Sequence, residues 1–326
     1  MPILITGGTG FLGTALARKL VQRGERVVLM ATRPRLEQLD DIKDRIKFVQ
    51  GDLNVWHEVL NIVKDNEIDG IFHMGAMLST PSEQNPWASF QTNVAGTMHV
   101  LEAARLFGVE KVFFASTSAT YELGISETIT EETLQRPTSA YGTSKLYGEL
   151  LGRFYRRKFG LDFRALRYFA VIGPGARTLM RSQYNSWMIE HAALGKPFEC
   201  FVTEDTCIPV TYIKDAVRAT EMLYYAPANG IKTVCYNVVG MTPAQPVKEL
   251  ERAIKKLIPD ASISYKPDPA TMEMFRSYPV RAVDTSPAQE EWGWQPAYTS
   301  FEMIVADFIR EVKERPQQYG IGNKTG

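Results

Sequence analysis

A glycine-rich turn near the N-terminus constrains this chain more than any other feature. An apolar run at 3–6 leads into Gly7, Gly10 and Gly13, and a stretch of helical periodicity follows at 11–22. In a strand–turn–helix unit of this kind, the first glycine makes the tight turn, the second lets backbone approach a pyrophosphate, and the third lets helix pack on strand. The helix N-terminus then presents free N–H groups to phosphate. The turn predicts a dinucleotide site formed by Gly7, Gly10, Phe11, Leu12 and Gly13.

Apolar runs alternate with helical stretches through the first half of the chain. Continuous apolar strands alternating with helices indicate a parallel sheet with both faces covered. We predict strands at 3–6, 26–31, 46–50, 70–73, 111–115 and 162–167, and helices at 11–22, 55–64, 84–107 and 141–159. The predicted fold class is α/β, a doubly wound parallel sheet of the Rossmann type over residues 1–172, with 207–240 returning to it.

The remainder of the chain, 173–326, has a less regular pattern and is expected to form a smaller C-terminal substrate-binding lobe. Helical patterns occur at 186–194, 215–225, 247–257 and 301–312, and strands are expected at 233–238 and 262–265. No clear linker precedes this part, so we interpret it as a lobe and not as an independent domain.

Composition favours a cytoplasmic enzyme with a small-molecule substrate. The 37 basic and 37 acidic residues cancel, so electrostatics give no reason to expect a nucleic acid or an anionic membrane as partner. Apolar runs fall short of the roughly 20 residues of a membrane span, and a first strand starting at residue 3 leaves no room for a signal peptide. Cys200, Cys207 and Cys235 show no metal or disulfide spacing, so we expect reduced thiols and no metal.

The residues after the second predicted strand bear on which dinucleotide binds. An acid there would accept from a ribose 2′-hydroxyl and indicate NAD. The chain has Ala31, then Thr32, Arg33 and, two residues on, Arg35. Guanidinium groups bind oxyanions in a bidentate manner and suit a 2′-phosphate. This pattern favours NADP(H); the alternative is that both arginines are solvated loop charges and NAD(H) binds.

Tyr141 and Lys145 stand four residues apart at the start of a predicted helix, so they share one face. A phenol has a pKa near 10, and a neighbouring ammonium would lower it. Such a tyrosine can exchange a proton with a substrate hydroxyl while the nicotinamide carries out the redox step. One hydroxyl of Ser116, Thr117 and Ser118, after the fifth predicted strand, would orient the substrate oxygen; the other two would cap or turn the chain.

Together these residues resemble the extended short-chain dehydrogenase/reductase family over nearly the whole chain, with signatures at 6–13, 51–53, 73–76, 93–97, 141–145 and 166–169. The resemblance implies that Thr117 is the catalytic Ser/Thr, Tyr141 the acid/base and Lys145 its partner. It also implies further cofactor contacts by Asp52, Leu53, Met74, Gly75, Ala76, Asn93, Tyr141, Lys145 and Tyr168.

Within that family, the stretches at 77–79, 83–86, 148–152, 158–162 and 292–294 look like the threonine dehydrogenase branch. This likeness implies that Ser79 touches the substrate, as would Thr117, Thr178 and Tyr184. The substrate loop at 174–185 departs from the branch: Tyr184 is kept, but the paired threonines and the aspartate are not. An Asp-Ser-Trp-Pro pattern of the branch is replaced by Arg-Ser-Tyr-Pro at 276–279.

The sequence therefore predicts an NAD(P)-dependent oxidoreductase that interconverts a small secondary alcohol, of the 3-hydroxy acid or 3-hydroxy amino acid type, with its ketone. A nucleotide-sugar epimerase or dehydratase is the alternative, although Ala170 stands where such enzymes usually carry asparagine. A cofactor-binding regulator without catalysis is a third reading, which the intact Thr117, Tyr141 and Lys145 disfavour. Arg177 or Arg181 either pairs with a substrate carboxylate or is a solvated loop charge.

The resemblance also implies a homodimer built on the helices around 90–107 and 141–158. The sequence itself shows only that these helices carry apolar residues on more than one face, such as Leu146, Leu150, Leu151 and Phe154. Burial within the monomer accounts for that pattern equally well.

Overall fold

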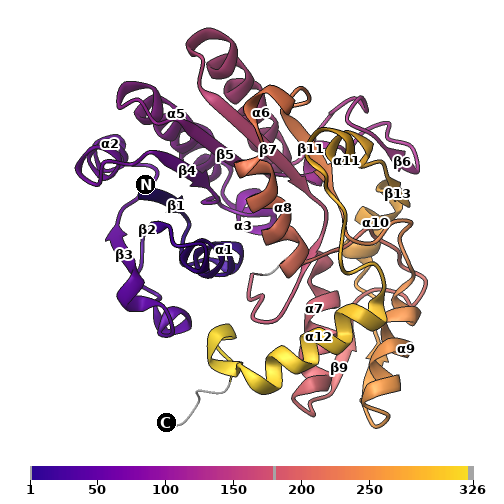
Figure 1. The fold of residues 1–326 in the computed structure, drawn as a ribbon. Coiled ribbons are helices and arrows are strands. Elements are labelled where there is room, and N and C mark those ends of the chain that lie inside the picture. Colours follow the sequence, from indigo (N-terminus) through magenta and orange to yellow (C-terminus); the bar gives the residue numbers. More distant parts are fainter. Residues whose placement is uncertain (1, 179–180, 322–326) are drawn as a thin grey trace.

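Seven parallel strands form the central sheet (Figure 1). The computed structural model describes residues 2–178 and 181–321. From one edge to the other the order is β3, β2, β1, β4, β5, β7 and β11. The strands are β1 (Pro2–Thr6), β2 (Arg26–Ala31), β3 (Ile46–Gln50), β4 (Gly70–His73), β5 (Lys111–Thr117), β7 (Asp162–Tyr168) and β11 (Cys235–Val238). The predicted doubly wound sheet is confirmed, and its order reverses between β1 and β4, where such sheets bind ligands at the carboxyl ends of the strands.

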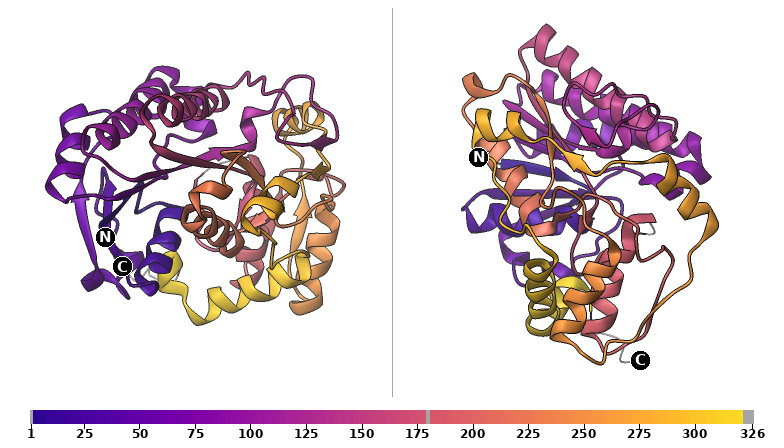
Figure 2. Two further views of the ribbon diagram at one scale, coloured as in Figure 1. Left: turned by 45° about the horizontal axis from the view of Figure 1, so that its top comes forward. Right: turned by 90° about the vertical axis from the view of Figure 1, so that its right-hand side faces the viewer.

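Helices cover both faces of the sheet (Figure 2). On one face, α1 (Phe11–Gln22) packs with α8 (Ile213–Tyr225), and their Leu16 and Leu223 are fully buried in one cluster. On the other face, α2 (Trp56–Asp65), α5 (Gly96–Leu106) and α6 (Ala140–Phe159) bury Val59, Val100 and Tyr155 in a second cluster. Burial on both faces explains why the strands are continuous apolar runs.

Most C-terminal elements gather beside the carboxyl edge of the sheet, but the helix at 286–292 packs along β11, where Glu291 accepts from the Thr233 N–H at 3.1 Å. The C-terminal elements are α7 (Tyr184–Ala193), β9 (Phe198–Cys200), α9 (Val247–Leu257), β12 (Ile263–Tyr265), α10 (Pro269–Ser277), α11 (Ser286–Trp292) and α12 (Phe301–Glu314). Met188 of α7 and Phe308 of α12 belong to the same hydrophobic cluster as α1, so the lobe and the sheet share one core.

Short strands also tie the two parts of the chain together. β10 (Thr211–Tyr212) pairs with β8 (Val171–Ile172), and β13 (Ala282–Val283) pairs with β6 (Thr128–Ile129). The chain thus crosses between sheet and lobe more than once.

The stretch predicted as one helix at 84–107 is divided in the structure. It contains the end of α3 (Ser79–Gln84), α4 (Pro86–Ser89), a π-helical segment η3 (Phe90–Ala95) and α5. Asn85 starts α4 because its side chain accepts from the Ala88 N–H at 3.0 Å, and Pro86 occupies the first turn. Isolated π turns are frequent at functional sites, and this one carries Asn93.

Short 3-10 turns link the main elements, at η1 (Glu37–Leu39), η2 (Lys43–Arg45), η4 (Ser118–Thr120), η5 (Arg181–Gln183), η6 (Ala228–Gly230) and η7 (Pro316–Tyr319).

Candidate active site

The backbone around the glycine turn after β1 packs so closely that a side chain larger than that of glycine would clash with it. Gly7 has a φ of +64°, and a Cβ built on it would lie 2.7 Å from the Gly75 Cα atom. A Cβ on Gly13 would lie 2.3 Å from the Gly7 carbonyl oxygen. Gly10 precedes α1, and no side chain of the described residues caps this helix N-terminus. The open N–H groups, with no acid in the first turn, fit a pyrophosphate.

Phe11 and Leu12 open α1 and are half-buried. The Phe11 ring lies 3.1 Å from the Cβ position of Gly173, so it forms a wall between the glycine turn and the segment after β7. Their backbone is thus placed beside the turn where the sequence predicts cofactor contact.

Thr32 and Arg33 follow β2 and are exposed. The Thr32 carbonyl accepts from Gln50 Nε2 at 3.2 Å, which holds this loop to the end of β3. In the described parts of the chain, the guanidinium groups of Arg33 and Arg35 have no protein partner. Both remain available to an anionic ligand at this edge.

The segments after β3 and β4 meet beside the glycine turn. Asp52 accepts from the Asn54 N–H at 2.9 Å, which rigidifies the first residues after β3. Leu53 is 8% exposed, and its Cδ1 lies 2.9 Å from the Cβ position of Gly75. Met74, Gly75 and Ala76 are half-buried on the other side. The predicted adenine-side and wall residues therefore lie side by side.

His73, at the end of β4, is buried. The sequence signature at 73–76 includes this residue but predicted no role for it. Its ring lies between the Thr6 hydroxyl, at 2.7 Å, and the Thr97 hydroxyl, at 3.0 Å. Burial, together with the Lys145 charge, lowers the pKa of His73 to about 3. A neutral imidazole thus connects β1, β4 and α5 beneath the site.

Asn93 uses its whole amide within the protein. Its Oδ1 accepts from the Met77 N–H at 2.8 Å, and its Nδ2 donates to the Met77 carbonyl at 2.9 Å and to the Ser144 hydroxyl at 3.0 Å. Asn93 therefore braces the segment after β4 against α6. Its predicted contact with the cofactor stays a prediction.

Thr117, Tyr141 and Lys145 are brought together where β5 ends against the start of α6. Ser139 caps the helix by accepting from the Gly142 N–H at 3.1 Å. The Thr117 side chain lies close enough to the Tyr141 phenol to influence its pKa. The Lys145 Nζ lies 5.9 Å from the centre of the Tyr141 ring. The three predicted catalytic side chains form one cluster.

The ionisation of this cluster differs from the sequence expectation. Burial raises the pKa of the Tyr141 phenol, and the neighbouring Thr117 side chain opposes this rise. Burial lowers the pKa of Lys145 to about 7. Lys145 was expected to lower the pKa of Tyr141; its ammonium donates to the Ala115 carbonyl at 2.8 Å, and burial makes the net shift of the Tyr141 pKa upward. Tyr141 is a neutral phenol at neutral pH, the form that donates a proton.

Two carboxylates that the sequence reading did not assign hold the start of α6. Glu122 accepts from the Ser139 N–H at 2.9 Å and from the Ser139 hydroxyl at 2.5 Å. Glu83, on α3, accepts from the Ala140 N–H at 2.7 Å. Negative charge is favourable at a helix N-terminus, so both fix the turn that carries Tyr141. Their partners lie on other segments of the chain, and the sequence pattern assigned neither carboxylate this role.

The predicted substrate residues fall into different environments. Ser79 begins α3, the helix that Glu83 joins to the start of α6, and is half-buried. Thr178 is exposed at the end of the described loop. Tyr184 is 1% exposed, and its ring packs edge-on against Phe201 and Phe275 at centroid distances of 6.0 and 6.2 Å. Tyr184 therefore serves the core of the lobe in this structure.

Arg177 already has an anionic partner. Its Nη1 lies 2.8 Å from Glu190 Oε1, so a substrate carboxylate would have to compete with Glu190. The side chain of Arg181 lies outside the described residues. Tyr168, predicted beside the cofactor, is 7% exposed and hydrogen-bonds the Thr220 hydroxyl. Its hydroxyl thus faces α8.

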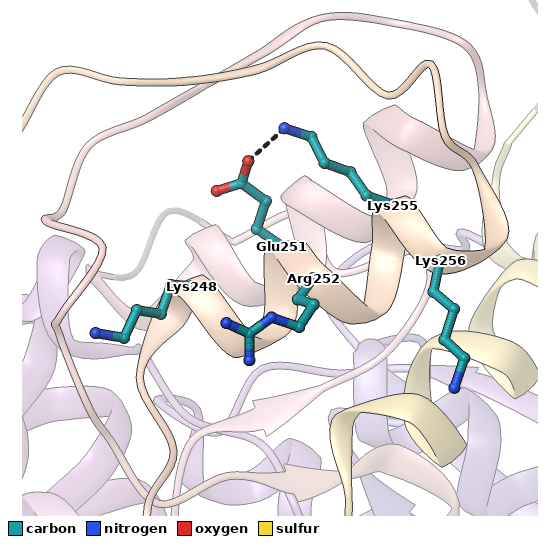
Figure 3. A pocket seen from close by; sticks show the side chains of 5 residues that line it. All are labelled: Lys248, Glu251, Arg252, Lys255 and Lys256. Atoms are coloured by element: carbon teal, nitrogen blue, oxygen red, sulfur yellow. Dashed lines mark hydrogen bonds and ion pairs between the residues drawn. The ribbon is translucent and has the colours of Figure 1, made fainter.

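A shallow basic hollow on α9 is separate from this cluster (Figure 3). It is lined by successive turns of one outer helix, and Lys255 pairs with Glu251 at 2.6 Å. Arg252 pairs with Glu249 at 2.5 Å. We interpret this surface as a solvated helix face. The other residues that line it are Lys248 and Lys256.

Across residues 2–178 and 181–321, no three His, Cys, Asp or Glu side chains are grouped to hold a metal ion. None of the helices in these ranges combines the length and apolarity that crossing a bilayer requires.

A glycine cradle at the head of a parallel sheet, with Thr117, Tyr141 and Lys145 on its carboxyl edge, defines a nicotinamide-dependent enzyme that acts on a CH–OH group. Residues 3–239 match the profile of the NAD dependent epimerase/dehydratase family, and the chain belongs to this family.

Named relatives include threonine dehydrogenases. The mitochondrial L-threonine 3-dehydrogenase of Bos taurus is 32% identical over 93% of this chain and 80% of that protein. The L-threonine dehydrogenase structure from Clostridium difficile superposes with a TM-score of 0.88 at 28% identity, covering 98% of this chain and 99% of that one. The GalE-like L-threonine dehydrogenase of Cupriavidus necator, in its holo form, has a TM-score of 0.87 at 28% identity and covers 96% and 100%.

Proposed function

We propose that this enzyme oxidises a small 3-hydroxy amino acid or 3-hydroxy acid to its ketone and catalyses the reverse reduction. The grouping of Thr117, Tyr141 and Lys145 carries the proposal, because it places a proton donor and an orienting hydroxyl together at the end of β5. The named relatives that act on L-threonine, a 3-hydroxy amino acid, support this substrate class.

The protein's part in the reaction is to hold one oxygen and move one proton. A bound nicotinamide ring supplies the two-electron chemistry at the carbinol carbon. In reduction, the neutral Tyr141 donates its phenolic proton to the ketone oxygen and becomes a phenolate. In oxidation, the Tyr141 phenolate takes the hydroxyl proton of the alcohol and becomes the neutral phenol again. The Thr117 hydroxyl donates to the same oxygen. Lys145, positively charged below its pKa of about 7, favours the phenolate that remains after proton donation.

The dinucleotide would lie along the carboxyl edge of the sheet. The glycine cradle supports placing the pyrophosphate on Gly7, Gly10, Phe11, Leu12 and Gly13, and the burial of Leu53 against Gly75 supports placing adenine beside Asp52 and Leu53. Met74, Gly75 and Ala76 would form the wall, with Asn93, Tyr168 and the Tyr141/Lys145 pair toward the nicotinamide.

NADP(H) is the favoured cofactor and NAD(H) the competitor. Arg33 and Arg35 are exposed after β2, and Ala31 stands where an acid would bind a ribose hydroxyl. A guanidinium binds phosphate with charge-assisted hydrogen bonds. The neighbouring Thr32 hydroxyl would donate to the same phosphate.

On the substrate side, Ser79 and Thr117 are the proposed contacts. Ser79 lies on α3, which Glu83 joins to the residue before Tyr141. Thr178 would reach the substrate from the loop, whereas Tyr184 would act by shaping the lobe core.

A homodimer through α5 and α6 is proposed from exposed apolar side chains. Leu150 is 58% exposed, and Phe154 and Phe159 lie one and two turns further along α6. Leu106 and Phe107 are exposed at the end of α5. Leu150→Glu with Phe154→Glu should convert a dimer to a monomer in sedimentation analysis; an unchanged mass would place any interface elsewhere.

Unpaired cysteines favour a cytoplasmic location.

The test is a substrate panel followed by absorbance at about 340 nm, where the reduced nicotinamide absorbs. L-Threonine and 3-hydroxybutyrate are supplied with NAD⁺ or NADP⁺, and β-keto acids and aryl ketones with NADH or NADPH. Steady cofactor conversion with a 3-hydroxy compound or its ketone supports the proposal. Turnover of UDP-sugars without net cofactor change would replace it with an epimerase.

A further inference from the structure

Glu149 is a buried carboxylate on α6 that the reaction scheme leaves unused. It is 1% exposed. Its Oε1 accepts from the Ser116 hydroxyl at 2.5 Å and from Arg167 Nε at 2.9 Å. Its Oε2 accepts from Arg167 Nη2 at 2.7 Å and from Gln135 Nε2 at 3.2 Å. This charge is therefore held rigidly by β5, β7 and the loop before α6.

Glu149 belongs to the same face of α6 as the catalytic pair, because residues four apart share one helical face. The end of β5 contacts all three members of that face. Thr117 lies close to Tyr141, the Ala115 carbonyl accepts from Lys145 at 2.8 Å, and the Ser116 hydroxyl donates to Glu149 at 2.5 Å. Three successive residues at the end of β5 thus contact side chains on successive turns of α6.

We propose that Glu149 is a positioning residue that keeps Lys145 in place and charged, and so supports Tyr141; this rests on the proposed function. Charged or titratable groups reach Lys145 from three elements. Tyr141 and Glu149 come from α6, and His73 comes from β4. From β7, Arg167 lies behind Glu149.

The pKa of Lys145 is set by burial and by the charges of the neighbouring groups, each of which acts in a definite direction. Burial lowers the pKa of Lys145 to about 7, and the charge of Glu149 opposes that fall. His73 is neutral because burial lowers its pKa to about 3. Arg167 stays cationic, since Glu149 raises its pKa against the cost of burial. A buried ion pair adds little stability over apolar packing, whereas a fixed negative charge beside a buried lysine has a direct electrostatic use.

The test is a carbon-13 NMR titration of protein labelled at lysine Cε, in the full chain without substrate, with Lys145→Arg used to assign the resonance. In Glu149→Gln the pKa of Lys145 should fall by about one pH unit or more. In Arg167→Gln it should rise, because Glu149 is then uncompensated. The double variant should lie between the two single variants. These opposite signs distinguish an electrostatic role from loosened packing.

Asp162→Asn is the matched control. Asp162 binds the fully buried Arg164 at 2.9 and 2.7 Å at the other end of β7, so its loss also strands an arginine. It should lower stability and leave the Lys145 titration unchanged. Should Glu149→Gln not fold, Arg167→Gln still tests the sign.

A Lys145 pKa that stays unmoved in the folded variants would overturn the positioning role, even in an active dehydrogenase. A shift of the predicted signs in an enzyme that turns over no 3-hydroxy compound would overturn only the proposed function. In an active enzyme, the alkaline limb of the kcat profile should move to lower pH in Glu149→Gln, and Asp162→Asn should leave it in place.

Discussion

The ammonium nitrogen of Lys145 lies 2.8 Å from the carbonyl oxygen of Ala115. This contact connects the catalytic helix to the strand whose terminal residue, Thr117, lies close to Tyr141. The reacting groups are therefore placed by the packing of α6 on β5. Because the lysine is buried, its charge costs free energy that the fold has to offset.

Replacing Tyr141 by phenylalanine removes the only proton that the proposed reaction moves through a protein side chain. We expect Tyr141→Phe to lower kcat by about a hundredfold to ten-thousandfold while the dissociation constant for the cofactor stays unchanged. Stopped-flow turnover and fluorescence titration with NADPH check both. Tyr155→Phe, on the same helix but bonded to Glu102 at 2.7 Å, is the control that should keep full turnover.

Gly13→Ala should abolish dinucleotide binding, because the new methyl group would lie 2.3 Å from the Gly7 carbonyl oxygen. The turn must shift, and the open helix N-terminus shifts with it. Calorimetric titration with NADH and NADPH measures the loss. Gly160→Ala, with a φ of +74° and open space around it, should cost about 1 kcal/mol of stability and leave affinity intact. Equal affinities in all three proteins would contradict the cradle.

Arg33→Ala should weaken the binding of NADPH by about tenfold or more and change the binding of NADH little. The reason is that the guanidinium binds the 2′-phosphate, which only NADPH carries. Fluorescence titration with both cofactors gives the ratio. Arg26→Ala, exposed at the opposite end of β2, should change neither affinity. Equal losses for both cofactors in Arg33→Ala would remove the phosphate role and favour NAD(H).

Lys145→Met should stabilise the fold while it removes activity. The pKa of Lys145 falls on folding from 10.5 to about 7, so the unfolded chain holds the proton more tightly than the native protein between these values. The cost is full below about pH 7 and fades as pH rises toward about 10. The gain in Lys145→Met, from urea unfolding, should therefore be largest at about pH 6 and small at about pH 10.

Lys214→Met is the control variant for the urea-unfolding measurements on Lys145→Met. Lys214 bonds to Asp307 at 2.6 Å and Glu311 at 2.7 Å, and these partners raise its pKa against a partial cost of burial. Its loss should destabilise the protein at neutral pH. A Lys145→Met variant that behaves like Lys214→Met would show that the lysine charge is not costly.

Much of the sheet could be predicted because strands buried on both faces leave continuous apolar runs between turn residues. The strand at 46–50 and the helix at 11–22 match β3 and α1. Other elements depend on distant partners. The π-helical turn at Phe90–Ala95 carries Asn93, whose partners Met77 and Ser144 lie far away in sequence. The two-residue strands β6 and β13 exist only through their mutual pairing.

Some residues of the candidate site could likewise be predicted from local sequence, and others could not. Spacing alone indicates Gly7, Gly10 and Gly13, because local backbone geometry demands glycine there. Tyr141 and Lys145 follow from helical periodicity, but the direction of the Tyr141 pKa shift depends on burial, which spacing does not reveal. Glu122 and Glu149 have partners on other elements, and local sequence patterns do not show such contacts.

The most direct measurement counts reduced cofactor against product in one reaction. Wild-type protein is incubated with L-threonine or 3-hydroxybutyrate and oxidised cofactor, and the ketone is quantified beside the absorbance at about 340 nm. We expect one equivalent of reduced cofactor per equivalent of ketone, with Tyr141→Phe forming neither. Product from a sugar nucleotide with no net reduced cofactor would contradict it.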